Sequence, residues 1–527
     1  MADKSYWQDR QEKKYLAGEK KVNQYYKDLE KSFEQSKREI QKVINDFVTR
    51  YAIENDTPGG FVTAQRLLNK TEIGDLQYFI DMVNKHMGEY NQELNNMSMK
   101  ARITRYQALE KQIDAILQQL YAIEYQYKGE ELLKDIYSDS YYQTWFNIDQ
   151  YHGFHQEFAQ INAKTIEELI KYPFNGADFS ARIWKQKDYM LQQLTESITT
   201  MLIQGKNPMT LSKDFAKKFG VKEFEAYRLL HTEGSFMMGQ GTLATYKEDG
   251  VEKYQILATL DIKTSDICRK QDGKVYDVDK AVVGVNYWPF HMFCRTTDVP
   301  YYDDEDYSED TRVARDPVTG KSYEVPANMA YKEWHERYIE SNPDAVLSEK
   351  KWKNRRSDKK QYENYMDVLG KDLSSNTLDD FQNLKYTNTE EWNLTKYNYK
   401  LQNKLKAGDG KHLEKYDKLS IADAKYTGYL FNPNNTEGYA KGKAFTSRLG
   451  YDINNYKELD KLIRSNIGKF PVIYKGSNKF GEKFEVNMVV KGLTGKQAKV
   501  KIGIMVDKDK DIPKLTTAFI DKLKESD

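Results

Sequence analysis

The side chains of this sequence best suited to metal binding or nucleophilic chemistry are two cysteines and a histidine. Cys268 and Cys294 are its only cysteines, and His291 lies three residues before the second. A His-x-x-Cys pair can supply part of a zinc site, but a structural zinc normally takes four protein ligands, so Asp266 or Asp272 would have to complete it. Two thiols packed as small apolar groups are the alternative. We expect packing and no cofactor, with a structural zinc as the less favoured alternative.

A Cys–His nucleophile is a third hypothesis for these residues. Such a site needs a group that orients the histidine and donors that stabilise the reacting oxygen. Neither is recognisable at a known spacing in this sequence, so we rank a structural role above a catalytic one.

Composition bounds the class of protein. A chain of 527 residues is expected to form two to four domains. Charged residues make up 31% and aromatic residues 13%, which favours a folded, soluble protein over a disordered one. No apolar run approaches the roughly 18 residues of a membrane span, and the N-terminus lacks the apolar core of a signal peptide, so we expect no membrane contact. Two cysteines in so long a chain indicate a reducing compartment.

Charge is distributed unevenly along the chain. Residues 401–527 hold 25 Lys and Arg against 16 Asp and Glu, an excess of nine, whereas the whole chain carries only +1. A basic C-terminal block favours a polyanionic partner, although a basic domain with a merely solvated face has the same composition.

A heptad pattern marks the clearest helix. Its apolar residues follow alternating steps of three and four, at Tyr106, Leu109, Ile113, Ile116, Leu120, Ile123 and Tyr127. The pattern predicts a helical hairpin packed inside one subunit. A seam between subunits is the alternative, but three heptads are short for a dedicated coiled coil.

The predicted fold class is multidomain, α + (α+β). Near the C-terminus, "VNMVV" and "VKIGIMV" predict two strands joined by the turn "KGLTGKQ". The predicted domains are a long helical region over 1–240, a small strand-bearing Cys/His module over 241–302, an extended connector over 303–404, and a small basic α+β domain over 405–527.

Residues around the two cysteines resemble the signature of the phage head morphogenesis family, the minor head proteins similar to the Mu F protein. The signature is met by Asp261, Thr264, Cys268, Asp272, Gly273, Lys274, Gly284, Pro289, His291, Cys294 and Arg295. The resemblance covers about residues 1–300 and is strongest from 175. Many members carry two further cysteines, where this chain has Gln271 and Thr296. This departure weakens the zinc hypothesis and favours a module held by packing and hydrogen bonds.

The basic C-terminal segment resembles a second group of proteins. The stretches "GDGKHLEKYDKLS", "GYAKGKAFTSRLGY", "LTGKQAKV" and "PKLTTAFI" look like small nuclease domains of the barnase, EndoU, colicin and RelE type. Such domains are found behind phage head proteins and in polymorphic toxins. The resemblance covers about 408–521. Many of these domains have a Trp in the strand after "GKQAKV", whereas this chain reads "KIGIMV".

A nuclease of this type would cleave RNA without a metal. The reaction needs a base for the 2′-hydroxyl proton, an acid for the 5′-oxygen and cations for the phosphorane. His412 suits the base or the acid, because histidine titrates near neutral pH. The other candidates in the resembling segments are Lys411, Lys441, Lys443 and Lys496 for charge stabilisation, and Thr517 for a hydrogen bond to the scissile phosphate. No cluster of Asp and Glu indicates a two-metal nuclease.

The two resemblances imply a phage minor capsid protein, located in the virion inside the head near the portal. It would act in head assembly or DNA ejection and carry a nuclease-like C-terminal domain. Its expected partners are the portal protein, other capsid and scaffold proteins, packaged DNA and, for an active nuclease, host RNA. It would be made in the host cytoplasm. Two alternatives stay open: a virion-delivered RNase toxin or effector, and a non-catalytic module that binds the genome.

Overall fold

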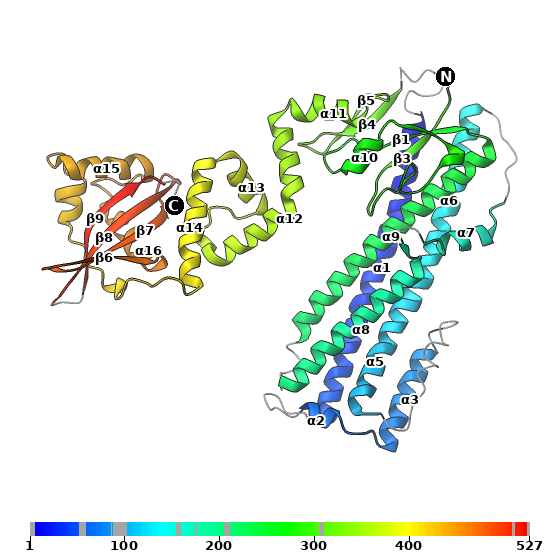
Figure 1. Ribbon diagram of the computed structural model, residues 1–527, viewed down its shortest axis with the longest axis horizontal. Coiled ribbons are helices and arrows are strands. Elements are labelled where there is room, and N and C mark those ends of the chain that lie inside the picture. The colour runs from blue at the N-terminus through cyan, green and yellow to red at the C-terminus, as the bar shows by residue number, and fades with distance from the viewer. Residues whose placement is uncertain are drawn as a thin grey trace. The chain divides into compact units, whose positions relative to one another are not determined.

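Long amphipathic helices dominate the first of the two units into which the chain folds, Met1–Asn342, and a four-stranded sheet ends the second, Pro343–Asp527 (Figure 1). The computed structural model describes residues 6–51, 60–85, 87, 103–153, 160–173, 176–204, 211–303, 305, 310–508 and 512–523. The predicted multidomain α + (α+β) class is confirmed. Within the described ranges, no helix has both the length and the apolar character needed to cross a membrane.

The helices of the first unit are α1 (Tyr6–Arg50), α2 (Gly60–Ala64), α3 (Lys70–Asn84), α5 (Arg105–Gln119), α6 (Lys128–His152), α7 (Ala163–Ile170), α8 (Phe179–Gln204) and α9 (Leu211–Asp249). Buried side chains recur along one side of α1, among them Val22, Leu29, Phe33 and Ile40, as an amphipathic helix requires. This apolar stripe packs against α5, α6 and α9, and the shared core runs the length of these helices.

The predicted helical seam packs inside the chain. Its first five residues are buried in the core shared with α1 and α8: Tyr106, Leu109, Ile113, Ile116 and Leu120. The pattern fails at its end, where Tyr127 is exposed and Tyr121 and Tyr125 are buried instead. The cause is a π-helical turn, η2 (Leu120–Tyr127), whose wider winding rotates the buried face. Because α5, η2 and α6 follow one another without a break, the turn of the predicted hairpin does not fall within 106–127.

Close packing of α9 against α6 depends on a glycine. A Cβ on Gly241 would lie 2.7 Å from the Tyr137 carbonyl oxygen, so a larger residue would push the two helices apart. Nearby, the buried Lys14 of α1 donates hydrogen bonds to the hydroxyls of Thr144 and Thr242. Burial lowers the pKa of Lys14 to about 8. The hydrogen bonds among Lys14, Thr144 and Thr242 fix the positions of α1, α6 and α9 along one another.

A small sheet follows α9 and confirms the strands expected in this region. β1 (Lys253–Leu257) pairs antiparallel with β2 (Val275–Asp277) and with β3 (Thr297–Tyr301), and the short helix α10 (Asp266–Gln271) connects β1 to β2. The first unit ends with a hairpin, β4 (Thr311–Arg315) and β5 (Ser322–Pro326), and the helical turns α11 (Tyr331–His335) and η6 (Glu336–Glu340). The hairpin and α11 lie in the segment that the sequence suggested was a connector.

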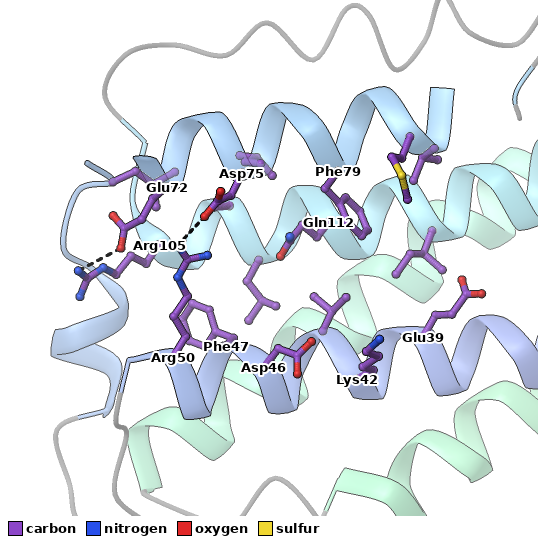
Figure 2. Close-up of a pocket in the computed structure, with 18 of the residues that line it drawn as sticks. Glu39, Lys42, Asp46, Phe47, Arg50, Glu72, Asp75, Phe79, Arg105 and Gln112 are labelled. Atoms are coloured by element: carbon purple, nitrogen blue, oxygen red, sulfur yellow. Dashed lines mark hydrogen bonds and ion pairs between the residues drawn. The ribbon is translucent and has the colours of Figure 1, made fainter. Parts of the chain in front are cut away.

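A groove of about 780 Å³ runs between α1, α3 and α5 (Figure 2). At one end, Arg50 pairs with Asp75 at 2.6 Å and Arg105 pairs with Glu72 at 3.2 Å. Asn69 and Glu72 form a capping box that begins α3. The two ion pairs hold α3 against α1 and α5.

The second unit begins with three helices: α12 (Pro343–Leu369), α13 (Leu378–Thr387) and α14 (Thr389–Lys406). They pack around aromatic side chains. Tyr365 stacks on Tyr399 with ring centroids 4.1 Å apart, and Phe381 meets Trp392 edge to face. This aromatic cluster was not predicted from the sequence, because the segment is polar overall and its aromatic residues are widely separated.

The C-terminal sheet is antiparallel, in the order β6 (Val472–Asn478), β7 (Gly481–Lys491), β8 (Gln497–Asp507) and β9 (Pro513–Asp521). The predicted strand pair is β7 and β8. Helices α15 (Thr436–Leu449) and α16 (Tyr456–Asn466) contribute Phe445 and Ile463 to a core with Met488 and Ile502 of the sheet. One face of the sheet is therefore apolar and packed.

Helix α14 extends across the predicted domain boundary at residue 405. Its Leu394, Tyr397 and Leu401 are buried in the core of the C-terminal sheet.

We predict that a fragment of residues 407–527 is less stable than one of 343–527 by about 5 kcal/mol, because each such side chain contributes about 1.5–3 kcal/mol when buried. Chemical denaturation of the two fragments measures the difference, and equal stability would contradict the role given to α14.

Candidate functional site

Cys268, His291 and Cys294 meet in one cluster, as the sequence predicts. The two sulfur atoms are 3.7 Å apart, and His291 Nε2 is 3.1 Å from the Cys268 sulfur. All three potential ligand atoms lie within 4.8 Å of one another. Two thiolates on a tetrahedral zinc, with bonds of about 2.3 Å, would lie about 3.8 Å apart, so these donors fit three positions around such an ion.

Hydroxyl groups and a backbone carbonyl complete the surroundings of His291. Ser265 Oγ, which also caps α10, lies 2.7 Å from His291 Nε2. His291 Nδ1 is 2.7 Å from the Met292 carbonyl oxygen, so Nδ1 carries the proton and Nε2 faces the thiols. Thr296 is buried where the resembling family has a further cysteine, and the carboxyl of Asp266 is mostly exposed. A fourth ligand of the Cys or His type is therefore absent from the cluster in the described residues.

The two thiols differ in acidity. The hydrogen bond with Cys294 lowers the pKa of Cys268 to about 7. Burial raises the pKa of Cys294 well above its ordinary value. Both residues are buried, which gives a substrate no direct access to either sulfur. The arrangement suits a structural cluster better than a nucleophile.

A second pair of motif residues ties together the loops on either side of the cluster. Arg295 donates to both carboxylate oxygens of Asp261, at 2.6 and 2.8 Å. The Lys263 backbone N–H and the Thr264 hydroxyl bind the same carboxylate. Burial would raise the pKa of Asp261, but Arg295 outweighs it and holds the pKa below its ordinary value. The pair fixes the loop before α10 against the loop before β3.

Asp272 is the most constrained residue of the motif. Its buried carboxylate accepts two hydrogen bonds from Arg312, at 2.9 and 3.0 Å, and one each from the backbone N–H groups of Ala258 and Tyr331, both at 2.7 Å. Arg312 also donates to the Ala258 and Met329 carbonyl oxygens. Asp272 is therefore engaged in joining β1, the β4–β5 hairpin and α11, and does not serve as the fourth zinc ligand that the sequence left open.

The structure places His412 and Lys411 at the β6 edge of the C-terminal sheet. Both residues are exposed. His412 Nδ1 lies 2.6 Å from the Gly468 carbonyl oxygen, and the Lys411 carbonyl accepts from the Val472 backbone N–H at 2.9 Å. The opposite edge of the sheet is β9, which carries Thr517.

The remaining predicted residues are spread over other elements. Lys441 on α15 binds Glu437 and Tyr429, Lys443 lies exposed over the Tyr439 ring, and Lys496 is exposed in the turn between β7 and β8. Lys441 also lies near β9, with its nitrogen 5.9 Å from the Phe519 ring centroid. In the described part of the chain no hydrogen bond or ion pair joins two of the six predicted site residues, and their role in RNA cleavage stays a prediction.

Sequence reasoning missed a polar cluster on the face of the sheet opposite its apolar core. We call this the polar face; its polar residues are Glu485, Asn487, Lys499, Lys501, Thr517 and Asp521, and Val489, Gly503 and Phe519 lie on the same face. Lys499 and Lys501 each place their nitrogen 3.4 Å from Asp521 Oδ2. Burial would raise the pKa of Asp521, but the two lysines outweigh it and the pKa lies below its ordinary value. Alternation of "VNMVV" and "VKIGIMV" was the available signal, since it places Asn487 and Lys501 away from the core.

Comparison with known proteins supports the first of the two resemblances. Residues 192–299 match the family described as Phage Mu protein F like protein, and this range contains the cysteine–histidine cluster. The match supports a phage-head-related protein. Residues 412–522 match a family described as Domain of unknown function (DUF6883), which assigns no activity to the C-terminal unit.

One curated relative shares part of the chain. The NAD(+)--arginine ADP-ribosyltransferase EFV of Enterococcus faecalis is 28% identical over 211 residues, which cover 39% of this chain and 43% of the relative. The chain thus spans less than half the length of this curated relative. No solved structure matches the chain.

For the cysteine–histidine cluster we predict that the module holds without metal, because hydroxyls stand where a fourth strong ligand would be needed. Dialysis against EDTA should leave the thermal midpoint of the protein unchanged, whereas Cys294→Ala should lower it by removing a buried side chain. Elemental analysis of the purified chain is the matched measurement. One zinc per chain, with a midpoint that falls on EDTA treatment, would contradict this prediction.

For the buried ion pair we predict that Arg312→Met destabilises the first unit by about 3–5 kcal/mol, because it leaves the Asp272 carboxylate buried without its charged partner. Lys332→Met, at an exposed position on α11, is the matched control and should change stability little. Denaturant unfolding measures the free energy of unfolding of both variants. Equal losses would show that the buried pair contributes no more to stability than an exposed charge.

Proposed function

We propose that this chain is a minor head protein of a phage particle, located inside the head near the portal, and that its C-terminal unit acts on nucleic acid. The first part is supported by the match of residues 192–299 and by the local structure of the motif that carries the resemblance. Its expected partners are the portal protein, other capsid and scaffold proteins and the packaged DNA.

The observation that carries this proposal is the bonding of the motif residues to one another and to the rest of the unit. Asp261 binds Arg295, Asp272 binds Arg312, and Cys268 contacts Cys294. Each of these side chains fixes a loop. Arg295 and Arg312 also line a small pocket of about 160 Å³, whereas both cysteines are buried. A module of this kind suits the ordered, load-resisting contacts of a capsid better than it suits catalysis.

The C-terminal unit is proposed to cleave RNA without a metal. It carries the excess of nine positive charges in residues 401–527, which suits a polyanionic substrate. Its polar face presents lysines and a carboxylate together, the two kinds of group that metal-free transesterification uses. A virion-delivered toxin acting on host RNA and a tether that only binds packaged DNA are the alternatives that the same basic domain allows.

The similarity to an arginine-specific ADP-ribosyltransferase raises a further candidate activity. It rests on 28% identity over part of the chain, and the activity in that relative's name belongs to the relative. Consumption of NAD⁺ in the presence of an arginine acceptor separates this candidate from RNA cleavage.

We predict that the full chain cuts single-stranded RNA and leaves DNA of the same sequence intact, with EDTA present or absent. The physical reason is that the 2′-hydroxyl is the nucleophile, and DNA has none. Gel analysis of matched end-labelled RNA and DNA measures the result. Cleavage of DNA at a similar rate, or loss of cleavage with EDTA, would contradict the mechanism, and salt-sensitive binding without any cleavage would favour the tether.

A further inference from the structure

A short stretch of α12, within the predicted connector, concentrates positive charge on one side of the helix. Residues 350–360 contain seven Lys and Arg against one Asp. At about 100° per residue, five of these cations fall within about 160° of the helix circumference. Four of the five are exposed and one is half-buried. We call this surface the basic face; its residues are Lys353, Arg355, Arg356, Lys359 and Lys360.

The one acidic residue of this stretch points away from the basic face. Asp358 is fully buried. Its carboxylate accepts hydrogen bonds from three residues of α13, at 2.7–2.8 Å: Gln382, Lys385 and Tyr386. The charge of Asp358 therefore holds α12 against α13, and it does not neutralise the cations on the other side of the helix.

Cations of the basic face are neighbours along the helix. Lys353 and Arg356 are three residues apart, and Arg356 and Lys360 are four apart. Like charges at these spacings destabilise a helix. Acidic partners lie at the two ends of the face, where Glu349 and Glu363 are 3.1 and 4.0 Å from a lysine nitrogen. In the described part of the chain, Arg356 and Lys360 have no ion pair, so the centre of the face lacks a counter-charge.

Arg355 adds a cation whose position is fixed. Its guanidinium lies 3.6 Å from the centre of the Trp352 ring and donates to the Trp352 carbonyl oxygen at 3.1 Å. Burial, and then the neighbouring charge of Arg356, lowers the pKa of Arg355. A stacked guanidinium keeps the planar set of donors that suits phosphate oxygens. The stacking also covers part of the indole ring, which would otherwise be the apolar group of this surface.

The chemistry of the basic face fits the phosphodiester backbone of a nucleic acid. Residues 353–360 extend over about 10 Å of helix, a length over which one strand of a duplex presents about three phosphates. A helix that lies on a membrane needs exposed apolar side chains beside its cations. The apolar side of α12 is instead buried, because Tyr365 and Leu369 pack against Phe381 of α13 and Trp392 of α14.

Helix α14 connects the basic face to the C-terminal sheet (Figure 1). Its Trp392 stacks on Tyr365 of α12 with ring centroids 5.7 Å apart, and its Leu394 and Leu401 are buried in the core of the sheet. Helix α12 and the sheet therefore belong to the same compact unit. Residues 401–527 of that unit carry the further excess of nine positive charges, so a long polyanion can contact both parts.

We propose that the basic face of α12 binds the phosphodiester backbone of a nucleic acid, independently of its sequence, and holds it on the C-terminal unit. The inference rests on the proposed function, in which this unit acts on nucleic acid, and adds the surface that holds the substrate. Lys353, Arg356 and Lys360 contact the phosphates, since they are exposed along the centre of the face. RNA and DNA share this backbone, and the experiment distinguishes them.

The experiment measures binding of the full chain to two labelled probes of the same sequence: duplex DNA, and single-stranded RNA with 2′-O-methyl groups, which cannot be cut. The triple variant Lys353→Gln, Arg356→Gln, Lys360→Gln should weaken binding about tenfold or more. It should also lower the slope of log Kd against log salt concentration by about two to three, because each lost phosphate contact releases about one counterion fewer. Glutamine retains a high helix propensity, and thermal unfolding shows whether the variant is folded.

A matched control removes the same three charges elsewhere. Lys20→Gln, Lys27→Gln, Arg38→Gln changes two lysines and one arginine at exposed positions of α1 and should bind both probes as wild type does. If the α12 triple variant does not fold, Arg356→Gln alone replaces it, with an expected loss of slope of about one.

Each outcome separates the surface from the proposed cleavage. Weaker binding of one probe alone assigns the basic face to that nucleic acid, and weaker binding of both supports a contact common to RNA and DNA. If the α12 variant and the α1 control bind both probes equally, or if the α12 variant loses only binding to phosphatidylserine vesicles, the inference is wrong. A wild-type chain that binds through α12 and cuts no RNA contradicts the proposed cleavage and leaves the inference standing, whereas a wild-type chain that binds neither probe contradicts both.

Discussion

The structure of the motif-bearing region depends on one buried charge. The Asp272 side chain is fully removed from solvent, and a carboxylate in that position must be paired and hydrogen-bonded or it destabilises the fold. Arg312 and two backbone N–H groups meet this requirement, and they come from the β4–β5 hairpin, β1 and α11. A single residue of the motif therefore determines how three separate segments join, and it extends the module beyond residue 302.

Local patterns in the sequence predicted the elements whose determinants are themselves local. Five of the seven seam positions from Tyr106 onward are buried, and "VNMVV" and "VKIGIMV" are the paired strands β7 and β8. The π-helical turn was not predictable, because it changes the period of a pattern without a marker such as proline. Arg312 as the partner of Asp272 was not predictable either, since it lies 40 residues away in an acidic stretch.

The candidate sites likewise divide into features that the local sequence predicted and features that depend on contacts between distant segments. The proximity of Cys268 and Cys294 followed from a motif, whereas the polar face depends on the register of three strands. His412 was singled out by its type and neighbours, yet its ring bonds the Gly468 carbonyl at the β6 edge. Residue types in sequence identify what chemistry is available, but only strand pairing decides which of them lie together on one face of the sheet.

In the proposed function, the helical unit with its Asp272-centred module belongs to the capsid and the basic unit contacts nucleic acid. The most direct test of this central claim is to quantify the chain by mass spectrometry in purified particles of the phage that encodes it, before and after protease treatment and DNA release. The account predicts a few copies per particle that resist protease while the head is full. Absence of the chain from purified particles, or complete digestion in intact heads, would contradict it.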